Sequence, residues 1–373
     1  MVIYKPGRKE KGILMKKIMK KLTWITLLIM CITISSGCSD KNKEVGIQTD
    51  AVTDDGAGKV EPTVKVDEDD YKRLVVTVGD NKVYYSEAMI YFQYIKAKYE
   101  SYFGDEIWTY DFGGQTFEEM AKEEIMNMIT QTKIISSKAS EYNVVLTEEE
   151  ENSIRVNATN FLDGVTEEDK LLYGFTQEIA EQFYRDNKLY ERVYDAVTID
   201  VNTEVPDENA KQITIQYVYV PTVTEDESGV VTNFSDEDKA KALAKAKELL
   251  EKAKETDNFL QFAQSNSISK EVEKTFGKTD DGISFRDDAF KLKTGELSDI
   301  IETEEGYYIL YCVTDFNEDA TREKKESIIA KRQNEYFQNL FKEWASDEKI
   351  DVKEKVWSSM RLVAATEKET AEE

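Results

Sequence analysis

The chain has 373 residues, of which 40% are hydrophobic and 11% aromatic, enough for two or three globular domains and too many for a chain disordered throughout. It holds 49 basic and 75 acidic residues and no histidine, for a formal net charge of −26. A surface this acidic repels nucleic acid and anionic lipid headgroups. It therefore excludes nucleic-acid-binding proteins and proteins that bind anionic membrane surfaces through charge.

The N-terminus has the pattern of a secretion signal. Four lysines precede an apolar run, residues 22–34, which is short for a permanent membrane span and leads through small residues to Cys38. The ending "SSGC" resembles the bacterial lipobox, although Ser35 stands where that motif usually has leucine. We predict a lipoprotein signal peptide over residues 1–38 and lipidation at Cys38, which anchors the chain to the outer face of the cell membrane. An ordinary cleaved signal or an uncleaved anchor is the alternative.

Signal cleavage makes the chain more acidic. It leaves 41 basic and 74 acidic residues, a net charge of −33, whichever of Met1 and Met15 is the true start. Cys312 is then the one cysteine of the body, so no internal disulfide forms, and without histidine it has no partners for a zinc site. We expect no metal and no cofactor. Residues 39–73 are acidic and poor in large apolar residues, which predicts a disordered tether.

Residues 74–206 change to a helical pattern. "LVVTVGDNKVYYSE" predicts a small β-hairpin, with a turn at Gly79. The pairs Thr116 with Glu119 and Thr147 with Glu150 are capping boxes at the start of two helices. Apolar residues recur at helical spacing through this region, so we predict a helical domain opened by a hairpin.

A second pattern follows over residues 207–317. "KQITIQYVYVP" alternates as a strand, a strong helix former and short helices come next, and "GYYILYCV" closes the region as another strand. This order predicts an α+β domain with a small antiparallel sheet. Residues 318–357 are predicted to form a helix and a strand. The helix carries an apolar stripe that includes Phe337 and Trp344, and we expect the segment to pack on the helical domain and complete it. We predict a disordered tail over residues 358–373.

Taken together, these segments resemble the secreted foldases of the PrsA and SurA type, in which a split helical chaperone domain surrounds a parvulin-type (rotamase, PpiC-like) peptidyl-prolyl isomerase domain. The opening "VVTVGDNKVYYSE" and the long helix "FEEMAKEEIMNMITQTKIISSKASEYNVVLTEEE" resemble the helical part. "FRDDAFKLKTGELSDIIETEEGYYILYCV" resembles the parvulin signature. The resemblance implies a chaperone for newly exported or unfolded polypeptides; whether it acts as a homodimer is left open.

The resemblance also implies a site, carried over position by position. Two residues match aromatics of the proline pocket and a third packs beneath it: Phe285, Phe290 and Leu297. The positions associated with catalysis fall on hydroxyl-bearing residues, the two histidines of the family being replaced by tyrosine: Tyr217, Tyr308, Ser269 and Thr303.

Loss of both histidines does not by itself end the chemistry. Prolyl isomerisation breaks no bond; its barrier is amide resonance, about 18–20 kcal/mol, so a catalyst needs an apolar slot and donors that favour the twisted amide. Hydroxyls of Tyr217, Tyr308 and Thr303 are candidates for these donors. The alternative is that the tyrosines are packed strand residues. The sequence therefore favours a foldase whose isomerase domain has weak or absent activity, with a fully active isomerase as the alternative. A solute-binding lipoprotein fits poorly because repeated βαβ units are not readable.

Overall fold

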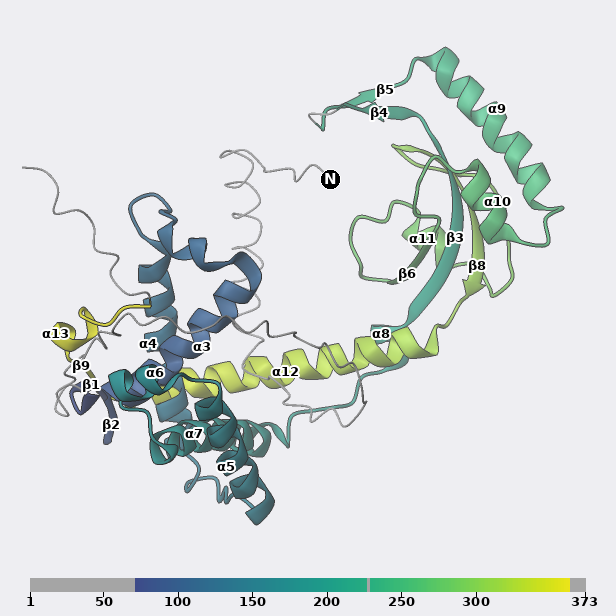
Figure 1. The fold of residues 1–373 in the computed structure, drawn as a ribbon. Helices are drawn as coiled ribbons and strands as arrows, with labels where there is room; N and C mark the ends of the chain where they lie inside the picture. The colour runs from purple at the N-terminus through teal and green to yellow at the C-terminus, as the bar shows by residue number, and fades with distance from the viewer. Residues whose placement is uncertain (1–70, 227–228, 363–373) are drawn as a thin grey trace, which may run out of the picture. The chain divides into compact units, whose positions relative to one another are not determined.

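A computed structural model describes residues 71–226 and 229–362 (Figure 1). They form two compact units, the first made of residues 71–196 and 347–362 and the second of the described residues within 197–346. The predicted signal peptide, Cys38 and most of the predicted tether lie outside the described residues. Within the described ranges, no helix is both long and apolar enough to cross a membrane.

The first unit contains a three-stranded antiparallel sheet. Its strands are β1 (Leu74–Val78), β2 (Asn81–Tyr84) and β9 (Ile350–Val352), in the order β2-β1-β9. Gly79 makes the tight turn between β1 and β2 with a φ of 55°. The predicted hairpin is thus present, and it gains a third strand from nearly 270 residues further along the chain.

Helices make up the rest of the first unit. They are α3 (Tyr85–Phe103), the 3-10 helix η1 (Asp105–Thr109), α4 (Phe117–Ser137), α5 (Glu148–Asp163), α6 (Glu167–Tyr173), α7 (Gln177–Thr198) and α13 (Glu354–Trp357). Both predicted capping boxes form: Thr116 caps α4 with Glu119, and Thr147 caps α5 with Glu150. Each hydroxyl accepts a backbone N–H that the first helical turn leaves without a partner, which explains why these two helices begin where they do.

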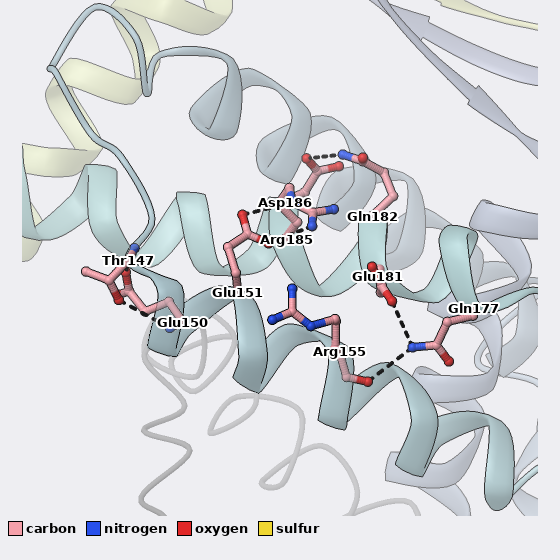
Figure 2. Close-up of polar contacts among 9 residues, drawn as sticks. All are labelled: Thr147, Glu150, Glu151, Arg155, Gln177, Glu181, Gln182, Arg185 and Asp186. Carbon is pink, nitrogen blue, oxygen red and sulfur yellow. Dashed lines mark hydrogen bonds and ion pairs between the residues drawn. The ribbon is translucent and has the colours of Figure 1, made fainter.

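Polar contacts join α5 to α7 (Figure 2). Arg185 donates to both carboxylate oxygens of Glu151, from Nε at 3.3 Å and from Nη2 at 2.7 Å. One turn or more away, Gln177 Nε2 donates to the backbone carbonyl of Arg155 at 3.1 Å and to Glu181 Oε1 at 2.9 Å. The side chains of Arg185 and Glu151 are each 30% exposed, so this seam fixes helix register more than it adds stability.

A buried ion cluster lies in the core of the first unit. Lys133 Nζ of α4 lies 2.6 Å from Glu87 Oε1 of α3 and 2.5 Å from Asp186 Oδ2 of α7. Gln182 Nε2 donates to the other oxygen of Asp186 at 2.9 Å. Burial raises the pKa of the Glu87 carboxyl, while the carboxylates around Lys133 outweigh its burial and raise the pKa of its ammonium. A single lysine therefore links three helices through charge.

The structure corrects two predicted boundaries of disordered segments. Within the predicted tether, the carbonyl of Tyr71 accepts a hydrogen bond from Ser86 Oγ at 3.2 Å. Within the predicted tail, Met360 and Leu362 are buried, and Leu362 N donates to Glu118 Oε1 at 2.7 Å. The tether and tail predictions failed at these ends because contacts with α3 and α4 hold short segments whose composition alone favours disorder.

The second unit is built on a four-stranded antiparallel sheet in the order β6-β3-β8-β7. The strands are β3 (Gln212–Pro221), β6 (Glu273–Gly277), β7 (Ile301–Glu302) and β8 (Gly306–Thr314), with a separate hairpin of β4 (Val223–Glu225) and β5 (Val231–Asn233). Its helices are α8 (Asp207–Ala210), α9 (Asp236–Ala253), α10 (Phe259–Asn266), α11 (Arg286–Ala289) and α12 (Glu318–Asp347). The predicted α+β class is confirmed.

The two faces of this sheet carry separate cores, because side chains alternate along each strand. Figure 1 shows α9 and α10 on one face of the sheet and α11 on the other. Val218 and Val220 of β3 belong to the core with α9 and α10, whereas Ile215 and Tyr217 belong to the core with α11. Among the described residues, the core of the second face is built with loops and the short α11. That sparse cover leaves room for a pocket.

Helix α12 begins in contact with the sheet of the second unit. Thr321 Oγ1 accepts from Gln212 N at 3.0 Å, and Lys325 pairs with Asp207 at 2.5 Å. Further along, Phe337 and Trp344 of the predicted apolar stripe are buried, with ring centroids 6.2 Å apart. The packing of this helix on the helical domain stays a prediction, as do the remaining domain boundaries.

Candidate functional site

A pocket of about 310 Å³ opens on the α11 face of the second unit's sheet. Its walls come from β3, β6 and β8, from the loop after α10 and from the loop before α11. The lining residues are Tyr217, Tyr219, Ile268, Ser269, Lys274, Gly282, Ile283, Ser284, Phe285, Glu305 and Tyr308. The strand register explains the meeting of β3 with β8, since Tyr219 pairs directly with Tyr308.

Four aromatic rings form the floor of this pocket. The ring centroids of Phe285 lie 5.2 Å from Tyr217 and 4.8 Å from Tyr308, and Tyr219 stacks on Tyr308 at 4.7 Å. Tyr217, Tyr308 and Phe285 are only 8%, 7% and 5% exposed. Three residues predicted to share a site are thus brought together, and they are packed as core on all sides except the one that faces the pocket.

The tyrosine hydroxyls differ in what they contact. Tyr219 Oη donates to the backbone carbonyl of Glu305 at 2.8 Å, and Tyr308 Oη donates a long bond of 3.5 Å to Glu305 Oε2. Burial raises the pKa of both phenols, so each stays a donor at neutral pH. Tyr217 has no hydrogen-bond partner for its hydroxyl within the part of the chain that the structure describes. Its hydroxyl is therefore a donor that a ligand in the pocket can use.

The other two predicted hydroxyls serve the backbone. Ser269 lines the pocket, but its Oγ donates to the carbonyl of Glu271 at 2.6 Å. Thr303 does not line it; its Oγ1 donates to the carbonyl of Gly306 at 3.0 Å and accepts from the N–H groups of Glu305 and Gly306, each at 3.3 Å. Thr303 therefore fastens the turn into β8 and has no free donor for a substrate.

The two remaining predicted residues lie away from the pocket lining. Phe290 packs behind the floor, with its ring centroid 6.0 Å from that of Phe276. Leu297 bridges Tyr311 and belongs to the core on the opposite face of the sheet, under α9 and α10. The expectation that Leu297 packs beneath the proline pocket is wrong, because its pairing with an odd-numbered residue of β8 turns it toward the other face.

Sequence reasoning missed several lining residues. Tyr219 follows Tyr217 by two positions, so strand alternation alone could have placed it on the same face. Ile268 is 68% exposed although it is apolar, and it lies at the pocket beside Ser269. Lys274, Ser284 and Glu305 carry no local signal, because their positions depend on how distant strands and loops meet.

The chemistry of the pocket comes from its rings, its hydroxyls and its two charged side chains. In the part of the chain that is described, no three histidine, cysteine or acidic side chains are placed to hold a metal ion. Burial raises the pKa of the Cys312 thiol to about 11, so it stays protonated and unreactive. The pocket offers an aromatic floor, hydroxyl donors and one charge of each sign.

The sequence matches a known domain family and several known proteins. The family of the PPIC-type PPIase domain (Rotamase) matches residues 225–314, which begins just after Tyr217 and Tyr219. Foldase protein PrsA of Clostridium botulinum (strain Langeland, Type F) is 27% identical over 293 residues, which is 70% of this chain and 82% of the relative. Foldase protein PrsA of Caldanaerobacter subterraneus subsp. tengcongensis is 22% identical over 245 residues, 64% of this chain and 72% of the relative.

Among solved structures, foldase protein PrsA from Streptococcus pneumoniae is 21% identical and covers 66% of this chain and 96% of its own, with a TM-score of 0.29. PrsA from Lactococcus lactis is 17% identical and covers 77% of this chain and 97% of its own, with a TM-score of 0.33. The family match and the curated relatives confirm the resemblance drawn from the sequence: the chain is similar to PrsA-type parvulin foldases, and its residues 225–314 match the PPIC-type PPIase domain.

Proposed function

We propose that this protein is a lipid-anchored, extracytoplasmic foldase that assists the folding of exported proteins, and that its PPIC-type domain grips proline-containing segments with weak or absent isomerase turnover. The observation that carries the proposal is the aromatic floor of Tyr217, Tyr308 and Phe285 in one pocket. Phe285 and Tyr308 lie within the residues that match the PPIC-type domain, and Tyr217 lies just before them. The similarity to proteins named foldase supports the general role.

The pocket suits recognition of an X-Pro segment. A proline ring is apolar and has no N–H, so an aromatic floor can cover it without leaving a donor unpaired. The Tyr217 hydroxyl, which has no partner among the described residues, can donate to a carbonyl beside that ring. These two contacts bind the ground state as well as the twisted amide, and equal binding of both lowers no barrier.

Weak turnover is supported by the state of the other hydroxyls. Ser269 and Thr303 donate to backbone carbonyls, and the Tyr308 hydroxyl faces the Glu305 carboxylate. A catalyst must stabilise the twisted amide more than the planar one, which requires hydrogen-bond donors aimed at the charge that develops on the twisted amide. These three hydroxyls are already engaged. The alternative, a fully active isomerase, is favoured by one observation: the Tyr217 hydroxyl lines an open pocket and is not engaged elsewhere.

A protease-coupled assay on a proline peptide tests the domain. We expect the full-length chain in mild detergent to accelerate isomerisation by less than about tenfold, a gain worth about 1.4 kcal/mol of barrier. Phe285→Ala should abolish peptide binding measured by fluorescence anisotropy, whereas Tyr336→Phe on exposed α12 should leave it unchanged. Rate enhancements of several orders of magnitude that vanish in Tyr217→Phe would establish the active-isomerase alternative instead.

The chaperone and anchor parts have separate tests. Stoichiometric full-length protein should suppress aggregation of a chemically denatured client, and no suppression at excess would overturn the holdase role. Radiolabelled palmitate fed to the producing cells should label the wild-type chain and not Cys38→Ser. Labelling of both would place the lipid elsewhere, and labelling of neither would support an ordinary signal peptide or an uncleaved anchor.

A further inference from the structure

Two opposite charges line the pocket without neutralising each other. Lys274 of β6 and Glu305 of the turn before β8 are both exposed lining residues. Neither takes part in an ion pair with any other residue that the structure describes, although many of the lysines of this unit do. Neither charge is therefore neutralised before a ligand arrives, although the Glu305 carboxylate accepts a long hydrogen bond from Tyr308 Oη.

Strand register places these charges at opposite ends of the aromatic floor. Lys274 pairs with Ile215, whose side chain belongs to the core of the pocket face, so Lys274 lies on that face of the edge strand. The backbone carbonyl of Glu305 accepts from Thr222 N at 2.8 Å, beyond the other end of β3. At about 3.3 Å per residue, the seven residue steps from Ile215 to Thr222 separate the two backbone levels by about 23 Å.

Tyr217 and Tyr219 lie between the two levels on β3, so a ligand seated on the floor has one charge to each side. Glu305 is held in place at its end: its carbonyl also accepts from Tyr219 Oη at 2.8 Å, and its carboxylate accepts from Tyr308 Oη. The Glu305 carboxylate turns back to within 3.5 Å of Tyr308 Oη, and Lys274 lines the same pocket, so each charge reaches a residue within about three positions of the proline.

We propose that Lys274 and Glu305 determine substrate specificity, so that the pocket selects extended segments with an acidic residue on one side of the proline and a basic residue on the other. This inference rests on the proposed binding of proline segments at this pocket. This selection concerns single positions of the bound segment. The net acidic surface of the chain favours basic clients as a whole, whereas Lys274 favours an acidic residue at one position beside the proline. Exposed pairs contribute modestly, so we expect discrimination of about two- to fivefold for each charge.

Five fluorescent peptides with one central proline test this. One is neutral, and the other four carry a charged residue three positions before the proline and another three positions after it. The charged pairs are Glu then Lys, Lys then Glu, two Lys, and two Glu. Affinities are measured by anisotropy on the full-length chain, and each is divided by the affinity of the neutral peptide for the same variant. One mixed order should exceed the other four peptides. Lys274→Gln should remove the gain from the Glu, and Glu305→Gln the gain from the Lys.

Lys278→Gln and Glu304→Gln are the matched controls, since both residues are exposed, close in sequence and outside the pocket lining. Neither should change the ratios. Binding of the neutral peptide with equal ratios for all charged peptides would overturn this inference and leave the proposed function intact. Failure of every peptide to bind would overturn the proposed function itself, and the inference with it. If the affinity ratios change as much in the control variants as in Lys274→Gln and Glu305→Gln, the effect comes from overall charge, and the inference is overturned.

Discussion

Burial decides what single side chains in the pocket can do. Tyr217 and Tyr308 are less than a tenth exposed and touch Phe285 with their rings, so their bodies belong to the core and only their hydroxyl ends serve a ligand. An imidazole at either position would offer a group that titrates near neutral pH. A phenol offers a donor that does not. Where the resemblance implies a histidine, a tyrosine thus reaches farther into the pocket.

Peptide binding should be independent of pH between about 6 and 9. The chain has no histidine, and burial raises the pKa of Tyr219 and Tyr308 above the ordinary value of about 10, which moves their titration further from this window. The measurement is peptide anisotropy across pH at constant ionic strength. An inflection inside the window would show that a titrating group of this site has been overlooked.

Lys133 should be far more important for stability than a surface lysine. Lys133→Met leaves Glu87 and Asp186 as two buried carboxylates without their cation, and we expect a loss of about 3–5 kcal/mol in the free energy of unfolding. Lys188→Met, which breaks an exposed pair with Glu191 on α7, should cost less than about 1 kcal/mol. Urea denaturation at neutral pH compares the two; equal losses would contradict the role of the buried cluster.

The same variant should recover stability on acidification. Burial already raises the folded-state pKa of Glu87 above its ordinary value of 4.5, and removal of Lys133 raises it further. A group with a raised folded pKa binds its proton more tightly when folded, so its contribution to stability is complete below the unfolded pKa and is lost as pH rises through the folded pKa. The loss in the free energy of unfolding that Lys133→Met causes should therefore be smaller near pH 4.5 than near pH 7. Repeating the urea series at both values checks the sign.

At the scale of elements, the turn into β8 determines where the pocket ends. Thr303 and Gly306 exchange hydrogen bonds across this turn, and Gly306 adopts a φ of 152° so that its backbone can approach β3. A Cβ at this position would lie 2.3 Å from the carbonyl oxygen of Val220. The glycine thus allows β3 and β8 to pair up to Pro221, which sets Glu305 at the pocket mouth.

Gly306→Ala should destabilise the second unit by at least about 2 kcal/mol, because it adds both backbone strain and a clash with Val220. Gly164→Ala is the control: Gly164 has a φ of −80°, and its Cβ would lie 3.4 Å from the nearest atom, the carbonyl of Phe161. That change should be neutral or mildly stabilising. Denaturation followed by tryptophan fluorescence and far-ultraviolet circular dichroism measures both, and a tolerated Gly306→Ala would contradict the close approach.

At the scale of the whole molecule, charge is the property that the two units share. The chain carries 75 acidic against 49 basic residues, and removal of the predicted signal peptide makes the balance more negative. Such a field attracts basic unfolded segments before any contact forms and repels acidic ones. It acts on encounter, whereas the pocket charges act on the bound segment. The two effects are separable because salt screens the first over about 8–10 Å.

Association with a basic unfolded client should slow on the order of tenfold when ionic strength rises from about 0.02 to about 0.5 M. Association with an acidic client should quicken under the same change, because its repulsion is screened. Stopped-flow fluorescence with a matched pair of clients that differ only in the sign of their charge measures both rates. Equal responses of the two clients would show that the acidic surface does not steer them.

Local signals in the sequence determined the elements and the class of the fold. The capping boxes at Thr116 and Thr147, the turn at Gly79 and the alternation of β3 depend on neighbouring residues only, and they identify helices, hairpin and strand correctly. The same signals identified Tyr217, Tyr308 and Phe285 as candidates for one site, through their resemblance to a known motif.

Only the tertiary structure decided which side chains share the pocket. The register of β6, β3 and β8 brings Lys274 and Glu305 to the face of Tyr217, while the pairing of Leu297 with Tyr311 sends it to the other face. The buried contacts of Lys133 with Glu87 and Asp186 join three helices in the same way. The physical reason is common to all of them: a strand's pairing partner and a helix's neighbour are set by burial summed over the whole fold, and no stretch of local sequence contains that sum.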